Sequence, residues 1–175
     1  MKSYNHLWEK VVDPENIKLA IRNAAKGKRK RKRVKKMLEN TDLYVPYFQD
    51  LAARYKHRHK VPKKIYDGIC KKQREIIVPS LDEQVLHHMM VNVLQPIITH
   101  GMYEFAYGSI PGRGPVDAKN QIKRWIAHNP KKCKYVAKWD IKSFFGSIPH
   151  DKLLVFIRER IHDEKFMRLL EEIIA

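Results

Sequence analysis

The segment 135–149 constrains the fold most, because a short apolar run there ends on an acidic residue and an aromatic pair follows at once. Side chains alternate along residues 135–140, with Trp139 on one face and Asp140 on the other, as the period of a β-strand requires. A carboxylate at a strand end can bind a divalent cation through oxygen. A surface Asp that caps the following turn fits the same pattern, so this segment alone leaves both interpretations open.

This segment is part of a series of sequence blocks that follow one another along the chain. They are Arg74-Glu75-Ile76-Ile77-Val78-Pro79, leading through Asp82 into an apolar helix that ends near Pro96, then Phe105–Gly114, then Trp139–Phe145, and last Ile148–Leu154. In this order and spacing they resemble the first motifs of bacterial reverse transcriptases, the family of group II intron, retron and diversity-generating retroelement enzymes. The resemblance covers roughly residues 70–175.

The resemblance implies an α+β chain, mostly helical with a few short strands, that forms the fingers and the start of the palm of a right-hand polymerase. A basic helical extension is expected over residues 1–65, the fingers over 66–132 and an incomplete palm over 133–175. Family members continue into a tight hairpin that carries a Tyr-x-Asp-Asp motif, and this sequence has no Asp-Asp pair. We therefore expect the N-terminal part of a larger RNA-directed DNA polymerase, inactive by itself and cytoplasmic in a bacterial or phage-encoded system.

The same resemblance assigns roles to individual residues. Asp140 matches the first of the three metal-binding acids of the family, so it is the expected catalytic residue and the one ligand that this chain gives to a two-metal Mg²⁺ site. Phe145 matches the steric gate that excludes ribonucleotides, while Phe144 is expected in the core. The remaining expected contacts to the incoming deoxynucleotide are Arg74, Lys72 and Ile141, with Lys71 as a weaker candidate beside Lys72.

A glycine-rich loop spans residues 108–114. It is neither a Walker loop, because no Gly-Lys-Ser/Thr follows, nor a dinucleotide-binding fingerprint, because no strand feeds it in a βαβ unit. By the resemblance it lies near the template strand, with Gly112 allowing close backbone approach and Arg113 meeting phosphate. The loop lacks the phenylalanine-arginine pattern common in group II intron enzymes, which leaves the subclass open, with a compact diversity-generating or phage-type enzyme as the preferred one.

The positive charge is concentrated in the first part of the chain. The formal net charge is +17, and residues 1–80 hold 22 basic against 8 acidic residues. Nine of the eleven residues 26–36 are basic, and the expected nucleic-acid contacts are Lys28, Arg29, Lys30, Arg31, Lys32 and Arg33. Partners of this charge are an RNA template, a DNA primer or an RNA–DNA duplex, beside the dNTP and a possible RNA or protein accessory factor.

Two alternatives stay open at this point. The basic run can be a solvated face without a specific ligand. The whole chain can be a non-enzymatic basic RNA-binding module, because its helices and aromatic residues do not make a complete active site. A reading frame that continues into a Tyr-x-Asp-Asp hairpin would favour the polymerase, and one that ends at Ala175 would favour the binding module.

The remaining patterns predict the elements that carry these residues. A helix over 5–25 should break or restart at Pro14, and the basic run should lead into a helix that docks on a core. A strand over 75–78 should precede a helix capped by Ser80 and Glu83, and Pro96 should kink or end that helix. Further helices are expected from Pro115, over 150–161 and over 164–174.

The composition excludes several other classes. No stretch approaches the ~20 apolar residues that span a bilayer, so no membrane partner is expected. Cys70 and Cys133 lie far apart and fit no zinc spacing, which indicates reduced thiols. The histidines form no cluster with a third ligand nearby.

Overall fold

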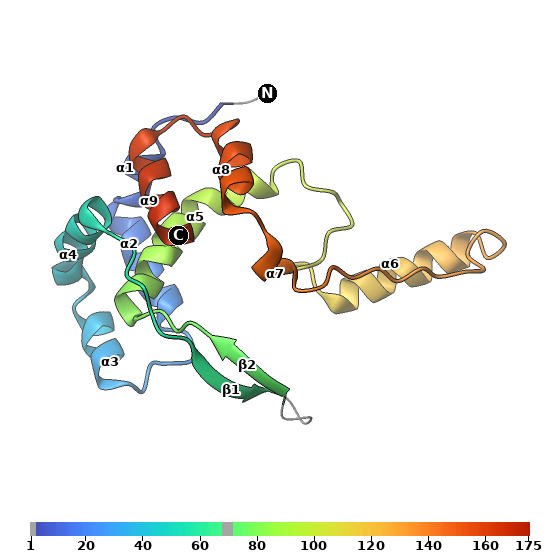
Figure 1. The fold of residues 1–175 in the computed structure, drawn as a ribbon, viewed down its shortest axis with the longest axis horizontal. Helices are drawn as coiled ribbons and strands as arrows, with labels where there is room; N and C mark the ends of the chain where they lie inside the picture. The colour runs from blue at the N-terminus through green and yellow to red at the C-terminus, as the bar shows by residue number, and fades with distance from the viewer. Residues whose placement is uncertain (1–2, 68–71) are drawn as a thin grey trace. The chain divides into compact units, whose positions relative to one another are not determined.

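The structure is a computed structural model that describes residues 3–67 and 72–175. The helices are α1 (Leu7–Val11), α2 (Pro14–Ala24), α3 (Lys32–Glu39), α4 (Thr41–Arg54), α5 (Leu81–Thr99), α6 (Pro115–His128), α7 (Phe144–Ser147), α8 (His150–Arg158) and α9 (Glu164–Ile174). The strands β1 (Lys63–Asp67) and β2 (Lys72–Ile76) pair antiparallel, with Ile65 opposite Arg74. This mostly helical α+β architecture agrees with the class expected from the sequence (Figure 1).

The chain divides into two compact units. The first unit joins residues 1–94 to residues 149–175, and the second comprises residues 95–148. The boundary falls inside α5, one residue before Pro96, and the helix continues past this proline to Thr99. Of the two expectations for Pro96, a kink or the end of the helix, the second is therefore wrong.

The core of the first unit is built by α1, α2, α4 and α9, which contact one another (Figure 1). Its completely buried side chains include Ile17 and Ile21 of α2, Phe48 of α4 and Phe166 of α9. Helix α5 adds a stripe of apolar residues to this core, with Val85, Leu86, Met89 and Met90 all buried. At roughly 1.5–3 kcal/mol for each large apolar side chain, this burial is the main stabilising term of the unit.

Local sequence rules explain where these helices begin. Pro14 occupies the first turn of α2 and Asp13 caps it, its side chain accepting from the backbone N–H groups of Glu15 and Asn16. Ser80 caps α5 as predicted: its Oγ accepts from the N–H of Glu83 at 3.3 Å, and the Glu83 carboxylate accepts from the N–H of Ser80 at 2.7 Å. These starts were readable from the sequence because the capping residues lie within four positions of one another.

A second kind of cap joins the two ends of the first unit. The Asp163 carboxylate caps α9 through the N–H of Phe166 and also accepts from the N–H groups of Leu7 and Trp8 at 2.7 and 2.8 Å. Partial burial opposes its ionisation, but these backbone hydrogen bonds prevail and lower the pKa of Asp163. Asp163 thus supplies the hydrogen-bond acceptor for the first N–H groups of α1, because the side chain of the N-cap residue His6 makes no capping hydrogen bond.

The second unit contains α6, α7 and the loops that flank them. Pro115 opens α6 as predicted, and the Asp117 carboxylate accepts from the N–H of Gly114 at 2.8 Å. Phe105 packs edge-on against Trp125 of α6, with ring centroids 4.8 Å apart. In the described part of the chain, Ile97 is the only buried apolar residue of this unit. The elements of the unit are therefore held mainly by local contacts.

The strand predicted over residues 135–140 is not formed. These residues have no regular secondary structure, and Tyr135, Val136 and Trp139 are each about 90% exposed. A strand needs a neighbouring strand for its N–H and C=O groups, and in the described residues the only paired strands are β1 and β2. The alternating pattern is present, but nothing beside it completes a sheet.

None of the helices in the described ranges is both long and apolar enough to cross a bilayer.

Candidate functional site

The basic run of residues 28–33 leads into the docked helix α3, as the sequence predicted. Val34 and Met37 anchor this helix in the core. Two cations of the run bind neighbouring side chains: Arg33 holds both oxygens of Asp82 at 2.8 and 2.6 Å, and the Lys28 ammonium donates to Gln84 and to the carbonyl of Ala24. Both contacts of Arg33 run from one guanidinium nitrogen, Nη2, to the two oxygens of the Asp82 carboxylate, which makes a charge-assisted ion pair.

The other cations of this run face solvent. Arg29, Lys30, Arg31 and Lys32 are all exposed, in the turn before α3 and at its first residue. The run is therefore divided between two cations that link α3 and the turn before it to α5, and four that remain available to a polyanion. The sequence could not separate these groups, since all six residues look alike until Asp82 and Gln84 are placed.

Arg74 and Lys72 lie on β2 of the first unit, where Arg74 is exposed and faces Ile65 on β1. Strand β1 was missed by the sequence analysis, which expected a strand only over residues 75–78, whereas β2 spans Lys72–Ile76. The side chain of Lys72 is not described, and Lys71 and Cys70 lie outside the described residues. The two-stranded hairpin is thus the element that carries the expected triphosphate contacts.

The glycine-rich loop has the backbone that its glycines allow. Gly112 has a φ of +75°, a value that L side chains adopt with strain, and Ile110 and Arg113 form an isolated bridge across the turn. The Arg113 guanidinium donates to the carbonyl oxygen of Glu104 at 2.9 Å, while its side chain stays exposed. Arg113 is therefore partly fixed by the loop and still accessible.

Asp140 lies at the end of the irregular segment, fully on the surface of the second unit. In the part of the chain that the structure describes, no group of three His, Cys, Asp or Glu side chains could hold a metal ion. One exposed carboxylate does not make a magnesium site, because Mg²⁺ needs several oxygen ligands in octahedral geometry. The described residues thus do not by themselves fit the metal that the reverse transcriptase family typically uses.

The aromatic pair after Asp140 starts the short helix α7. Its rings pack at a centroid distance of 5.4 Å and an angle of 65°. Phe145 is 86% exposed, and Phe144 is 48% exposed, so the expectation that Phe144 is a core residue is wrong for this structure. The reason is the same as for the missing strand, because no packed layer of the second unit covers this segment. Ile141 is also exposed.

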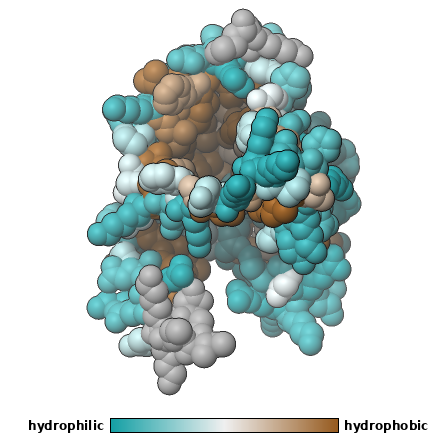
Figure 2. All heavy atoms as spheres, turned by 90° about the vertical axis from the view of Figure 1, so that its right-hand side faces the viewer, coloured by the Kyte–Doolittle hydropathy of each residue, from teal (hydrophilic) through white to brown (hydrophobic). Residues whose placement is uncertain are grey.

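Exposed apolar residues are concentrated in and around this segment. They include Ile122, Trp125 and Ile126 of α6 and the run Tyr135, Val136, Trp139, Ile141, Phe144 and Phe145. Figure 2 shows apolar side chains open at the surface between hydrophilic ones. Large exposed apolar patches mark surfaces that bind another molecule or another segment of protein.

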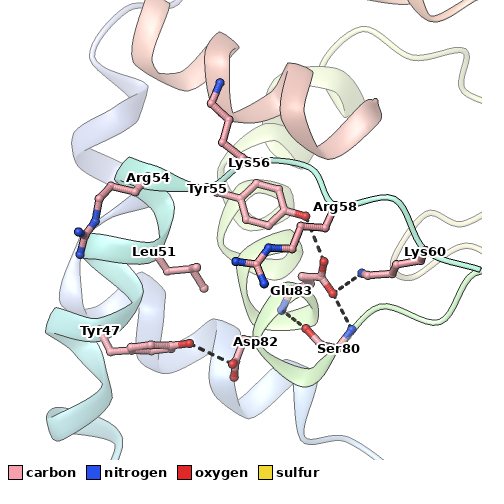
Figure 3. Close-up of a pocket in the computed structure, with 10 residues that line it drawn as sticks. All are labelled: Tyr47, Leu51, Arg54, Tyr55, Lys56, Arg58, Lys60, Ser80, Asp82 and Glu83. Atoms are coloured by element: carbon pink, nitrogen blue, oxygen red, sulfur yellow. Dashed lines mark hydrogen bonds and ion pairs between the residues drawn. The ribbon is translucent and has the colours of Figure 1, made fainter.

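A pocket that the sequence analysis did not identify lies in the first unit, between α4, the segment after it and the start of α5. It has a volume of about 560 Å³ and is lined by Tyr47, Leu51, Arg54, Tyr55, Lys56, Arg58, Lys60, Ser80, Asp82 and Glu83 (Figure 3). Residues 54–64, a second segment rich in basic residues, supply five of these side chains, of which four are basic. The available signal was the spacing of Tyr47 and Leu51, which places them on one face of a helix.

Comparison with known proteins assigns the family. The family described as "Reverse transcriptase (RNA-dependent DNA polymerase)" matches residues 61–173, which is more than half of the chain. The chain therefore belongs to the reverse transcriptase family, as the motif order indicated.

Three curated proteins illustrate the relationship. The chain is 28% identical to Protein YkfC of Escherichia coli (strain K12) over 130 residues, 74% of this chain and 32% of that protein. It is 29% identical to "Uncharacterized 91 kDa protein in cob intron" of Schizosaccharomyces pombe, over 57% of this chain and 12% of that protein. It is 27% identical to "Putative COX1/OXI3 intron 2 protein" of Saccharomyces cerevisiae, over 58% and 11%. The chain thus spans a third or less of the length of these relatives.

Proposed function

We propose that this chain is the fingers and first palm portion of an RNA-directed DNA polymerase that copies an RNA template from a primer. The observation that carries the proposal is the family match over residues 61–173, which contains the hairpin with Arg74 and the segment with Asp140. The expected boundaries are those given above: a basic extension to residue 65, fingers to residue 132 and palm from residue 133.

In this proposal each of the expected site residues has one task. Asp140 would give one oxygen ligand to Mg²⁺, and the other ligands would come from outside the described residues. A metal bound there would supply positive charge at the phosphates. Arg74 and Lys72 of β2 bind the triphosphate of the incoming nucleotide, and Ile141 and Phe145 contact its sugar. Asp140, Ile141 and Phe145 are exposed, which supports the proposal that substrate and further protein cover this surface.

The exposed cations of the run 28–33 and Arg113 of the glycine-rich loop bind the backbone of the template and of the primer. An accessory RNA or protein would bind to the same exposed cations. A chain of only these residues is expected to bind nucleic acid without copying it, since its described part holds no complete metal site. This behaviour is that of the second candidate, a non-enzymatic RNA-binding module.

Primer extension on an RNA template by the full-length protein tests the proposal. Asp140→Asn should lower the rate of DNA synthesis by several orders of magnitude and leave nucleic-acid affinity unchanged, because it removes charge but little volume from an exposed position. The matched control is Asp151→Asn, an exposed acid in the first turn of α8, which should retain activity. Wild-type synthesis by Asp140→Asn would remove this residue from the site. If neither the wild-type protein nor the two variants synthesise DNA, but all of them bind RNA tightly, the result would favour the binding module.

A further inference from the structure

The pocket beside α4 combines an aromatic wall with an arginine that has no ion-pair partner in the described residues. Tyr47 and Leu51 are one helical turn apart on α4 and form one side, and Figure 3 shows the guanidinium of Arg58 turned toward the centre, between Tyr55 and Leu51. In the described residues, no hydrogen bond or ion pair engages Arg58, whereas Arg54, Lys56 and Lys60 are paired with Asp50, Glu172 and Glu83. Arg58 is therefore the cation of this pocket that is available to an anion.

The aromatic wall is held in place before any ligand arrives. The Tyr47 hydroxyl donates to Asp82 at 3.0 Å, and its ring packs edge-on against the buried Phe48, with centroids 5.1 Å apart. The ring is nevertheless 46% exposed, so one face is free to be covered. Burial and the hydrogen bond to Asp82 raise the pKa of Tyr47, which keeps the hydroxyl a neutral donor. A ring fixed in this way loses little conformational entropy when a flat ligand stacks on it.

The two acids of the pocket do not repel an anionic ligand strongly, because both are already neutralised. Asp82 accepts hydrogen bonds from Nη2 of Arg33 and from the Tyr47 hydroxyl. The Glu83 carboxylate receives the Lys60 ammonium, the Tyr55 hydroxyl and the N–H of Ser80. With four basic and two acidic lining residues, the pocket has an excess of positive charge.

We propose that this pocket binds one nucleotide unit of a single nucleic-acid strand, with the base against Tyr47 and Leu51 and a phosphate at Arg58. An aromatic face beside a cation is the arrangement that binds single strands, since every base has a π-face and every linkage a charge. A volume of about 560 Å³ is in the range of small-molecule sites and admits a nucleotide. The site lies wholly in the first unit and does not depend on Asp140 or on polymerase activity.

The experiment separates base recognition from binding of the backbone. The probe is a short fluorescent oligoadenylate, compared with the same strand in which the central bases are replaced by abasic sugars. Both strands carry the same charge, so the basic run binds them equally, and only a base site distinguishes them. For the wild-type chain we expect the abasic strand to bind roughly five- to 100-fold more weakly, the range of one stacked base.

Three variants assign that difference to the pocket. Tyr47→Leu should reduce the ratio of the two affinities toward one, and Tyr47→Phe, which keeps the ring, should preserve most of it. Arg58→Gln should weaken the binding of both strands by a similar factor and leave the ratio unchanged, because it removes a phosphate contact. Thermal unfolding checks that each variant is folded, as expected for substitutions of exposed side chains.

Competition with adenosine monophosphate identifies the source of the nucleotide. Displacement of the strand from wild type but not from Tyr47→Leu assigns the pocket to a free nucleotide, and no displacement with an intact affinity ratio assigns it to a nucleotide within a strand. An affinity ratio of one for the wild-type chain, or the same ratio in wild type and Tyr47→Leu, overturns the proposal. Neither result bears on the polymerase assignment, which the Asp140 test decides.

Discussion

The two units of the chain differ in what covers their apolar side chains. In the first unit they lie inside a helical core, with Phe48 and Phe166 fully buried. In the second, Trp139 is 91% and Phe145 86% exposed, although this unit carries Asp140, Arg113 and Phe145. The first unit has the packing of a self-supporting fold, and the second has the exposed surface of a binding region. The difference shows that the apolar residues next to Asp140 are left exposed in the described chain, whereas those of the first unit are covered.

The largest effect is expected when the same substitution, Phe to Ala, is made in both units. This experiment tests the comparison directly. Phe48→Ala should lower the free energy of unfolding by about 3–5 kcal/mol, because it leaves a cavity beneath the tyrosines of α4. Phe145→Ala should change it by less than about 1 kcal/mol, since an exposed ring has little packing to lose. Urea unfolding followed by circular dichroism measures both. Equal losses for the two variants would show that Phe145 is packed in solution and would break the contrast.

The second prediction concerns what Phe145 does if it is not a core residue. If the proposed function is right, Phe145→Ala in the full-length protein should reduce discrimination against ribonucleotides by roughly tenfold to 100-fold, because no ring would overlap the added hydroxyl. Single-nucleotide addition with matched dNTP and rNTP measures the ratio. The control is Phe144→Ala, on the neighbouring residue. If only Phe144→Ala changes the ratio, the gate is one residue earlier, and if neither does, this segment does not touch the sugar.

The third prediction concerns the polar network that joins α5 to the segment after α4. Although partial burial opposes ionisation, hydrogen bonds from Lys60 and Ser80 lower the pKa of Glu83 from 4.5 to about 2. The folded-state pKa is depressed, so this stabilisation is fully present above pH 4.5 and is lost as the pH falls toward 2.

Glu83→Gln should therefore make stability less dependent on pH over this window. The difference should be about 1–2 kcal/mol, less than the full linkage value because the Lys60 side chain is 29% exposed and partly screened. Denaturant unfolding at several pH values measures it, with the exposed Glu159→Gln as the control. An unchanged pH dependence in Glu83→Gln would show that the network does not hold in solution.

The smallest expected effect separates the two kinds of cation in the basic run. Changing Arg29, Lys30 and Lys32 together to Gln should reduce the salt slope of RNA binding by roughly 2–3, at about 0.7–0.9 per phosphate neutralised. The control changes Lys10, Arg22 and Lys165, which lie elsewhere on the first unit, to Gln. Fluorescence anisotropy across a salt titration gives both slopes. Identical slopes would show that the exposed run is only solvated surface.

Local sequence determined much of the helical framework. Pro14, the Ser80–Glu83 box and Pro115 each mark a helix start within a few residues, and capping chemistry acts at that range. Motif order also identified the family, because it requires residues in a given sequence and spacing and no coordinates. The hairpin strand β1 and the continuation of α5 past Pro96 were missed or misjudged, since strand pairing and helix packing override local preference.

Only the tertiary structure decided which charges are available and which apolar residues are covered. Six similar cations lie in the turn before α3 and in the first two residues of this helix, and the positions of Asp82 and Gln84 select Arg33 and Lys28 as the ones that hold the fold. Asp163 caps a helix more than 150 residues away, and no local pattern reports such a partner. Residues 135–140 alternate as a strand does but remain irregular, because a strand is stabilised by its neighbour and not by its own sequence.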